Sequence, residues 1–200
     1  MTFVPTLRWM GLGVTAVCVV MLGGASVGAQ LGGAKAWQTA QTRVVPVKGM
    51  PDTPFPVEQR KAAPDFTLTD TQGHEVTLSG YKGKVVLLDF WATWCGACKF
   101  EVPWYSEFSK KYGDKGLAVV GVSMDKEGLA AVKPYMEQMK MDYTVVLGND
   151  DLVPQFGLKT IPVTWLIDRE GRVAVAHVGM VDKESFEQNI QKLLQEGASQ

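Results

Sequence analysis

Two continuous apolar runs lie in the middle of the chain, VVLLDFWA at 85–92 and LAVVGVSM at 117–124. Runs of this length, rich in β-branched residues, are typical of strands that are buried on both faces of a sheet. Between them, apolar side chains recur every three or four residues over 97–112, which predicts an amphipathic helix. The pattern therefore predicts a strand, a helix and a second strand in succession.

Weaker patterns predict the remaining elements. Short strands are expected in segments bounded by turn signals, namely 66–69, 76–78, 143–147, 163–167 and 173–178. Helices are expected over 127–140, where Pro134 should break or kink the helix, and over 182–195, with Asp182 as N-cap. This order of elements predicts an α/β fold with a mixed sheet and helices on both faces, opened by a β-hairpin.

The first 29 residues carry one charge, Arg8, and no acid. An apolar run followed by small residues is the layout of a secretory signal peptide, with Val27-Gly28-Ala29 as a plausible cleavage site. An uncleaved membrane anchor over 9–29 is the alternative, and a buried helix a third. Cys18 lies inside the run, and we interpret it as a small apolar residue, with lipidation as the alternative. Both main interpretations place the protein outside the cytoplasm, in the periplasm or at the inner membrane.

The rest of the chain divides into two parts. Residues 30–61 contain four prolines and no sustained period, which predicts an extended linker. Residues 62–197 hold all the predicted elements and are expected to form one domain. The formal net charge of −1 provides no basic surface, so nucleic acid is not an expected partner.

Two of the three cysteines, Cys95 and Cys98, lie where the first buried strand meets the helix. The start of a helix has unpaired N–H groups and a partial positive charge, which stabilise a thiolate. Cys95 should therefore attack a substrate disulfide, and Cys98, one turn further on, should resolve the mixed disulfide. Half of a zinc site and a static disulfide are the alternatives. Zinc needs four ligands, and neither a second cysteine pair nor a nearby histidine pair exists, so we expect no metal.

The segment FWATWCGACK is similar to the active-site segment of thioredoxins. Together with APDFTLTD, SMD and IPVTWLID, it resembles membrane-associated thioredoxin-like reductases of the TlpA/ResA type over about 62–196. The resemblance implies a thioredoxin fold with an added N-terminal β-hairpin and a central insertion. It also implies extracytoplasmic thiol–disulfide exchange in cytochrome c maturation or copper-centre assembly. The expected partners are apocytochrome c or copper-site proteins and a membrane electron donor, and no cofactor is expected.

Two acidic positions match residues of these families. Glu101 corresponds to a family glutamate one turn after the second cysteine, where it would shuttle a proton for Cys98. Asp89 lies where thioredoxin has a buried acid, whereas many TlpA/ResA-type proteins have Asn, and it would accept the Cys98 proton. In the alternative interpretation, both side chains point to solvent.

The remaining matches concern substrate binding. Pro162, in Thr160-Ile161-Pro162, corresponds to the cis-proline that faces the dithiol and exposes the Ile161 backbone to a substrate peptide. A trans proline at the start of a strand is the alternative.

Trp94 is expected to shield Cys95 and to form part of an apolar substrate surface together with Gly96 and Ala97. Gly96-Ala97 replaces the Gly-Pro of thioredoxin, which frees the Ala97 N–H to help hold a thiolate. Two other functions stay open: a thiol peroxidase of the peroxiredoxin type, and a non-catalytic copper or apocytochrome chaperone.

Overall fold

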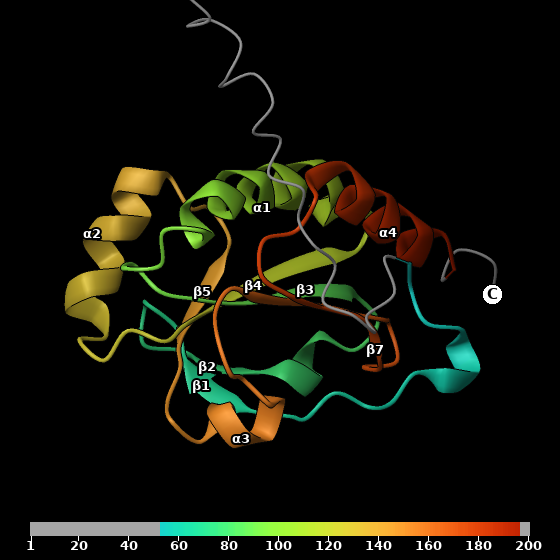
Figure 1. Ribbon diagram of the computed structural model, residues 1–200, viewed down its shortest axis with the longest axis horizontal. Helices are drawn as coiled ribbons and strands as arrows, with labels where there is room; N and C mark the ends of the chain where they lie inside the picture. Colours follow the sequence, from blue (N-terminus) through green and yellow to red (C-terminus); the bar gives the residue numbers. More distant parts are fainter. Residues whose placement is uncertain (1–52, 197–200) are drawn as a thin grey trace, which may run out of the picture. The chain divides into compact units, whose positions relative to one another are not determined.

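The computed structural model describes residues 53–196, coloured in Figure 1. The expected signal peptide or anchor (1–29), Cys18 and most of the expected linker lie outside the described residues. Within 53–196, every helix is too short or too polar to cross a membrane.

A five-stranded mixed sheet forms the centre of the domain, with strand order β5-β4-β3-β6-β7. Its strands are β3 (Val85–Trp91), β4 (Leu117–Ser123), β5 (Thr144–Leu147), β6 (Val163–Ile167) and β7 (Val173–Val178). The strands β3, β4 and β5 run parallel, whereas β6 is antiparallel to β3 and β7 is antiparallel to β6. Every residue of β3 is buried, as the continuous apolar run predicts.

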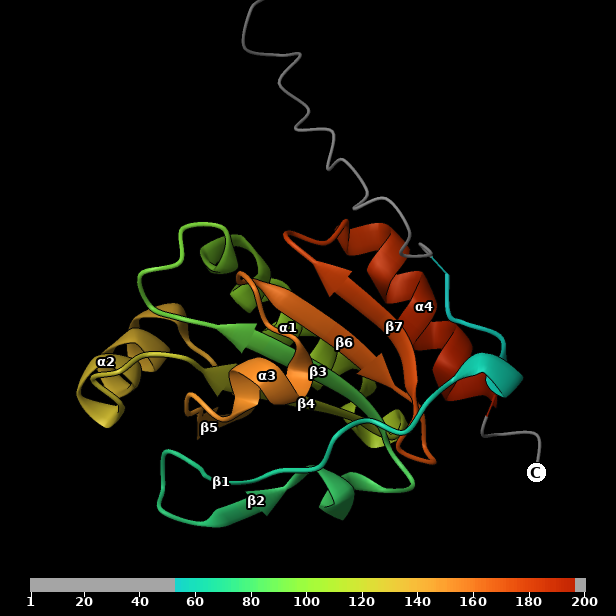
Figure 2. The same ribbon diagram turned by 60° about the horizontal axis from the view of Figure 1, so that its bottom comes forward.

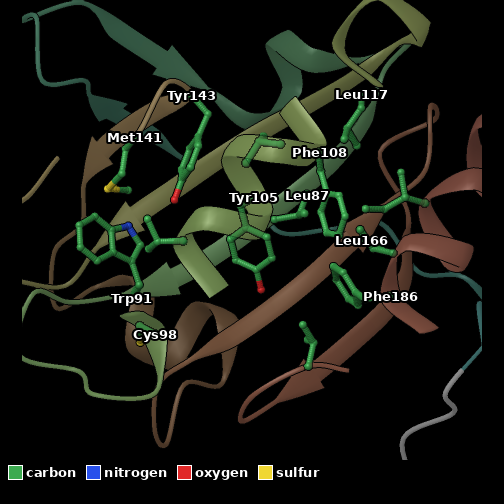
Figure 3. Close-up of a cluster of buried hydrophobic side chains, with 14 of the residues drawn as sticks. Leu87, Trp91, Cys98, Tyr105, Phe108, Leu117, Met141, Tyr143, Leu166 and Phe186 are labelled. Carbon is green, nitrogen blue, oxygen red and sulfur yellow. The ribbon is translucent and has the colours of Figure 1, made fainter. Parts of the chain in front are cut away.

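Helices cover both faces of this sheet, as expected (Figure 1). The helices are α1 (Cys98–Tyr112), α2 (Leu129–Met139), α3 (Leu152–Phe156) and α4 (Lys183–Glu196). On one face, Leu87 and Trp91 of β3 belong to a core cluster with Phe108 of α1 and Ile190 of α4. Figure 3 shows part of that cluster, with Tyr105 and Phe108 of α1 among side chains of the sheet.

The opposite face is covered by α3 and by the expected N-terminal hairpin, β1 (Thr67–Thr69) and β2 (Glu75–Thr77). A hydrogen bond from the Thr71 N–H to the Val145 carbonyl, at 3.1 Å, and a bridge between Asp70 and Val146 join the hairpin to the edge strand β5. The segment with α2 and β5, between β4 and α3, supplies the expected central insertion. Three one-turn 3-10 helices complete the described elements, at Val57–Gln59, Leu78–Tyr81 and Gly113–Lys115.

The structure corrects one expectation about helices and adds one helix that was not expected. The helix expected over 127–140 spans Leu129–Met139 and continues through Pro134 without a break. Pro134 lies in the middle of α2, where its missing N–H removes one helical hydrogen bond while the helix continues on both sides. The short helix α3 has no counterpart in the sequence analysis, because five residues with an internal proline give too little periodicity.

The last residues of the expected linker, 53–61, pack against the domain, and we call them the N-terminal strap. The Phe55 N–H donates to the Ala174 carbonyl at 2.8 Å, and Lys61 accepts a hydrogen bond from the Val173 N–H at 2.8 Å. The Arg60 side chain is buried and forms ion pairs with Asp168 and Glu196. Figure 2 shows the strap beside the C-terminal end of α4. Packing thus begins at Phe55 rather than at Ala62.

Candidate active site

Cys95 and Cys98 form a disulfide at the junction of β3 and α1. Cys98 is the first residue of α1, and its N–H donates to Cys95 Sγ at 3.2 Å. Cys95 is 6% exposed and Cys98 is 1% exposed. Cys95 is the more exposed of the two, as expected if Cys95 attacks and Cys98 resolves. Cys95 is nevertheless nearly buried in the disulfide form. The N–H that reaches Cys95 is that of Cys98, whereas the sequence pointed to Ala97.

Large apolar side chains lie exposed on both sides of the disulfide in the sequence. Trp94, which the sequence singled out, is 68% exposed, and Phe100, which it did not, is 63% exposed. Phe100 lies in the first turn of α1, off the face that Cys98, Val102 and Tyr105 bury in the core. The helical period of the apolar residues places Phe100 outside the buried stripe. This position is the sequence signal that could have identified Phe100 as an exposed aromatic residue of the site. Exposed aromatic side chains at this site form an apolar surface next to the sulfurs.

The segment expected to bind substrate backbone lies just before β6. The Ile161–Pro162 peptide bond is cis, so the trans alternative is wrong. Thr160 is exposed, Ile161 is half-buried, and Pro162 is buried. Ile161 packs against the core cluster that contains both cysteines. Of the two residues between the cysteines in the sequence, Gly96 is exposed and Ala97 is half-buried.

Glu101 is fully buried in α1, which excludes the solvent-facing alternative. Its Oε1 accepts a hydrogen bond from the Val181 N–H at 2.7 Å, while Oε2 has no hydrogen-bond partner among the described residues. Burial raises the pKa of the Glu101 carboxyl to about 7, although the hydrogen bond from Val181 acts in the opposite direction. Near neutral pH this carboxyl therefore exchanges a proton readily.

Asp89 is also buried, on the face of β3 that packs against α1. Its Oδ1 accepts a hydrogen bond at 3.1 Å from Thr164 Oγ1, which lies directly opposite in β6. Because Thr164 has one hydroxyl hydrogen, the Tyr105 O–H donates to Thr164, at 2.9 Å. Burial, followed by the charge of Glu101, raises the pKa of the Asp89 carboxyl well above its ordinary value.

Thr164 and Tyr105 are site residues that the sequence analysis missed. Thr164 reaches Asp89 only through the antiparallel pairing of β3 with β6, a register that no local pattern reveals. Tyr105 looked like one more apolar position of the helix. Together with the two carboxyls, these side chains build a buried polar cluster in the core layer that also holds Cys98.

A thioredoxin-like fold with a CxxC disulfide at the start of its first long helix is the architecture of a thiol–disulfide oxidoreductase. The sequence also matches the AhpC/TSA family over residues 60–176, which is more than half of the chain. The chain therefore belongs to the AhpC/TSA family and, within its thioredoxin-like members, is a thiol–disulfide oxidoreductase.

Known proteins agree with this assignment. The thiol-disulfide oxidoreductase ResA of Bacillus thuringiensis subsp. konkukian is 33% identical over 138 residues, covering 68% of this chain and 79% of its own. The ResA of Geobacillus kaustophilus is 35% identical over 132 residues, covering 66% and 75%. A crystal structure from Chlorobium tepidum, described as a thiol:disulfide interchange protein DsbE, is 38% identical with a TM-score of 0.64. It matches 68% of this chain and 96% of that one.

Proposed function

We propose that this protein reduces disulfides in proteins outside the cytoplasm, in cytochrome c maturation or copper-centre assembly. The observation that carries the proposal is a CxxC disulfide between β3 and α1 with exposed aromatic residues beside it in the sequence, together with buried carboxyls in the same two elements, Asp89 in β3 and Glu101 in α1. The charge-free segment 9–29 supports the location, as a signal peptide or as an inner-membrane anchor. A structurally similar protein of Streptococcus pneumoniae, 30% identical with a TM-score of 0.57, is described as an exposed lipoprotein thioredoxin.

In the proposed cycle the reduced protein starts with a Cys95 thiolate and a Cys98 thiol. The thiolate attacks one sulfur of the substrate disulfide, which forms a mixed disulfide and releases one substrate thiolate. Cys98 then transfers its proton to a buried carboxylate, Glu101 or Asp89, and attacks Cys95 Sγ. The second substrate sulfur leaves as a thiolate, and the Cys95–Cys98 disulfide remains. Two electrons have passed to the substrate, and a membrane electron donor returns them to the protein.

The substrate surface in this proposal surrounds Cys95. Trp94 and Phe100 provide apolar contacts, and Gly96 and Ala97 leave the backbone between the cysteines uncovered. Thr160, Ile161 and Pro162 would pair with the substrate main chain as an added strand. Such main-chain pairing suits extended segments, such as an apocytochrome c or a copper-site protein whose cysteines are not yet ligated.

Trapping in cells tests the proposal, because a resolving-cysteine variant cannot release its clients. Cys98→Ser in the full-length chain should accumulate mixed disulfides through Cys95, and mass spectrometry should identify cytochrome c or copper-site proteins outside the cytoplasm. Cys95→Ser, the matched control, should capture nothing. Clients that are confined to the cytoplasm, or adducts equally abundant in both variants, would contradict the proposal.

Two assays separate the alternatives. Reduction of insulin disulfides with dithiothreitol as the electron source is expected for a reductase. Rapid turnover of hydrogen peroxide with a thiol donor, without insulin reduction, would instead establish a thiol peroxidase. A tight 1:1 copper(I) complex without insulin reduction would establish a chaperone.

A further inference from the structure

Asp125, which follows the end of β4, binds the turn that carries Cys95. Its Oδ1 accepts a hydrogen bond from Thr93 Oγ1 at 2.6 Å, and its Oδ2 accepts one from the Thr93 N–H at 3.0 Å. The Thr93 N–H also lies 3.2 Å from Oδ1, and Ser123 Oγ donates to Oδ2 at 2.9 Å. Asp125 is only 6% exposed, and none of the ion pairs of the described residues includes it. Hydrogen bonds alone therefore satisfy this buried carboxylate.

The number of donors explains why a carboxylate stands here. An ionised carboxylate only accepts hydrogen bonds and offers about four lone-pair sites. The Thr93 N–H, the Thr93 hydroxyl and the Ser123 hydroxyl all point to it. An amide in the same place would turn its NH₂ group towards donors and lose part of these bonds. The site thus selects an acid, even though burying one is costly.

Thr93 lies two residues before Cys95, in a turn whose backbone is held on both sides. The Met124 N–H donates to the Trp91 carbonyl at 2.8 Å, and the Cys95 N–H donates to the Ala92 carbonyl at 3.1 Å. Asp125 holds the residue between these two points. The position of Cys95 Sγ, 3.2 Å from the Cys98 nitrogen, depends on the path of this turn.

We propose that Asp125 is a positioning residue for the redox centre: through Thr93 it keeps Cys95 Sγ on the N–H of Cys98. In the reduced protein the same N–H would donate to the Cys95 thiolate, and hydrogen bonds to charged acceptors are about twice as strong as neutral ones. Asp125 therefore stabilises the reduced form and makes the Cys95–Cys98 disulfide easier to reduce, without touching either sulfur. This inference concerns the exchange chemistry and does not depend on the client or the compartment.

Redox titration against glutathione tests the proposal with two variants that alter the contact differently. Asp125→Asn removes the charge and one acceptor, whereas Thr93→Val keeps the charge and removes the hydroxyl. Asp125→Asn should lower the equilibrium constant for reduction of the disulfide about tenfold, which is about 30 mV for two electrons. Thr93→Val should change it in the same direction by a smaller factor. The pH midpoint for alkylation of Cys95 by iodoacetamide should rise in both variants.

Thr93→Ser is the matched control, because it keeps the hydroxyl and should preserve the wild-type constant to within about twofold. Urea unfolding of each variant separates this effect from a loss of stability. Constants that stay within about twofold of wild type in both variants, whatever their stability, would show that Asp125 only supports the fold. A constant that rises in Asp125→Asn and is unchanged in Thr93→Val would mean that its charge acts through space, and would also overturn the proposal.

Discussion

Glu101 and Asp89 are two carboxyl groups enclosed in one apolar layer, and each has one oxygen without a hydrogen-bond partner among the described residues. Two like charges in such a place repel each other and lack water, so the cluster favours the protonated forms. A proton acceptor that ionises near neutral pH is what resolution by Cys98 requires. The same property makes the folded state sensitive to pH.

Glu101→Gln should flatten the dependence of stability on pH between about 4.5 and about 7. In this window the unfolded chain releases the Glu101 proton and the folded chain keeps it, so the free energy of unfolding falls as the pH rises. The pKa difference corresponds to about 3 kcal/mol, and Asp89 adds a change of the same sign. Urea unfolding of the oxidised protein across this window measures the slope.

Glu137→Gln is the control for this measurement, because Glu137 is exposed on α2. That variant should keep the wild-type slope. An unchanged slope in Glu101→Gln would mean that Glu101 is ionised in the folded protein throughout the window.

Phe100→Ser should weaken binding of protein substrates without changing the chemistry at sulfur. Removing a large exposed aromatic side chain from a contact surface typically costs about 1–2 kcal/mol of binding, so KM for insulin should rise roughly tenfold with little change in kcat. The rate with a small disulfide should stay unchanged. Val57→Ser, another exposed apolar position, lies in the strap and should affect neither rate. An equal loss with both disulfides would contradict a role in substrate binding.

Among elements, the sequence predicts strands and helices best where the pattern is long. The two apolar runs match β3 and β4, and the expected N-cap is confirmed because Asp182 Oδ1 accepts the Ser185 N–H at 2.9 Å. The chemistry of Cys95 and Cys98 could be predicted because it depends on local position at a helix start. The roles of Thr164, Asp125 and Arg60 could not be predicted, because their hydrogen-bond and ion-pair partners come from strands or segments that are distant in sequence.

Gly121 in β4 is explained by close packing against the rings of Trp91 and Tyr143. A Cβ at Gly121 would lie 2.9 Å from Trp91 Nε1 and 3.1 Å from an atom of the Tyr143 ring. Gly121→Ala should therefore destabilise the domain by about 1–3 kcal/mol, since overpacking forces buried rings to shift. Gly113→Ala is the control, because a Cβ there meets nothing within 4 Å, and it should be neutral or stabilising. Equal urea midpoints for both variants would contradict this explanation.

At the scale of the whole described domain, the N-terminal strap connects the first described residues to the C-terminal end of α4. The Arg60 guanidinium donates to both oxygens of Glu196, at 2.7 and 2.9 Å, and to Asp168 at 3.3 Å. Asp168 also accepts a hydrogen bond from Arg172 at 2.9 Å, so it keeps a cation if Arg60 is removed. The strap therefore belongs to the folded unit.

Arg60→Ala should lower the free energy of unfolding by about 2–3 kcal/mol, less than for a fully isolated buried pair because Arg172 compensates Asp168. Glu196→Gln should cost less than about 1 kcal/mol, since the Glu196 side chain is 42% exposed and water screens it. Neither substitution should shift the redox equilibrium with glutathione. Equal losses of stability in the two variants would mean that Asp168 contributes little to holding Arg60.

The strap meets the domain where β6 ends, opposite the first residues of β3, whereas Cys95 follows the last residue of β3. A strand of seven residues spans roughly 20 Å. A tether attached upstream of the strap would therefore hold the domain at the end of the sheet that is remote from Cys95 and Cys98. The reactive end would then face away from the point of attachment and stay accessible to protein substrates.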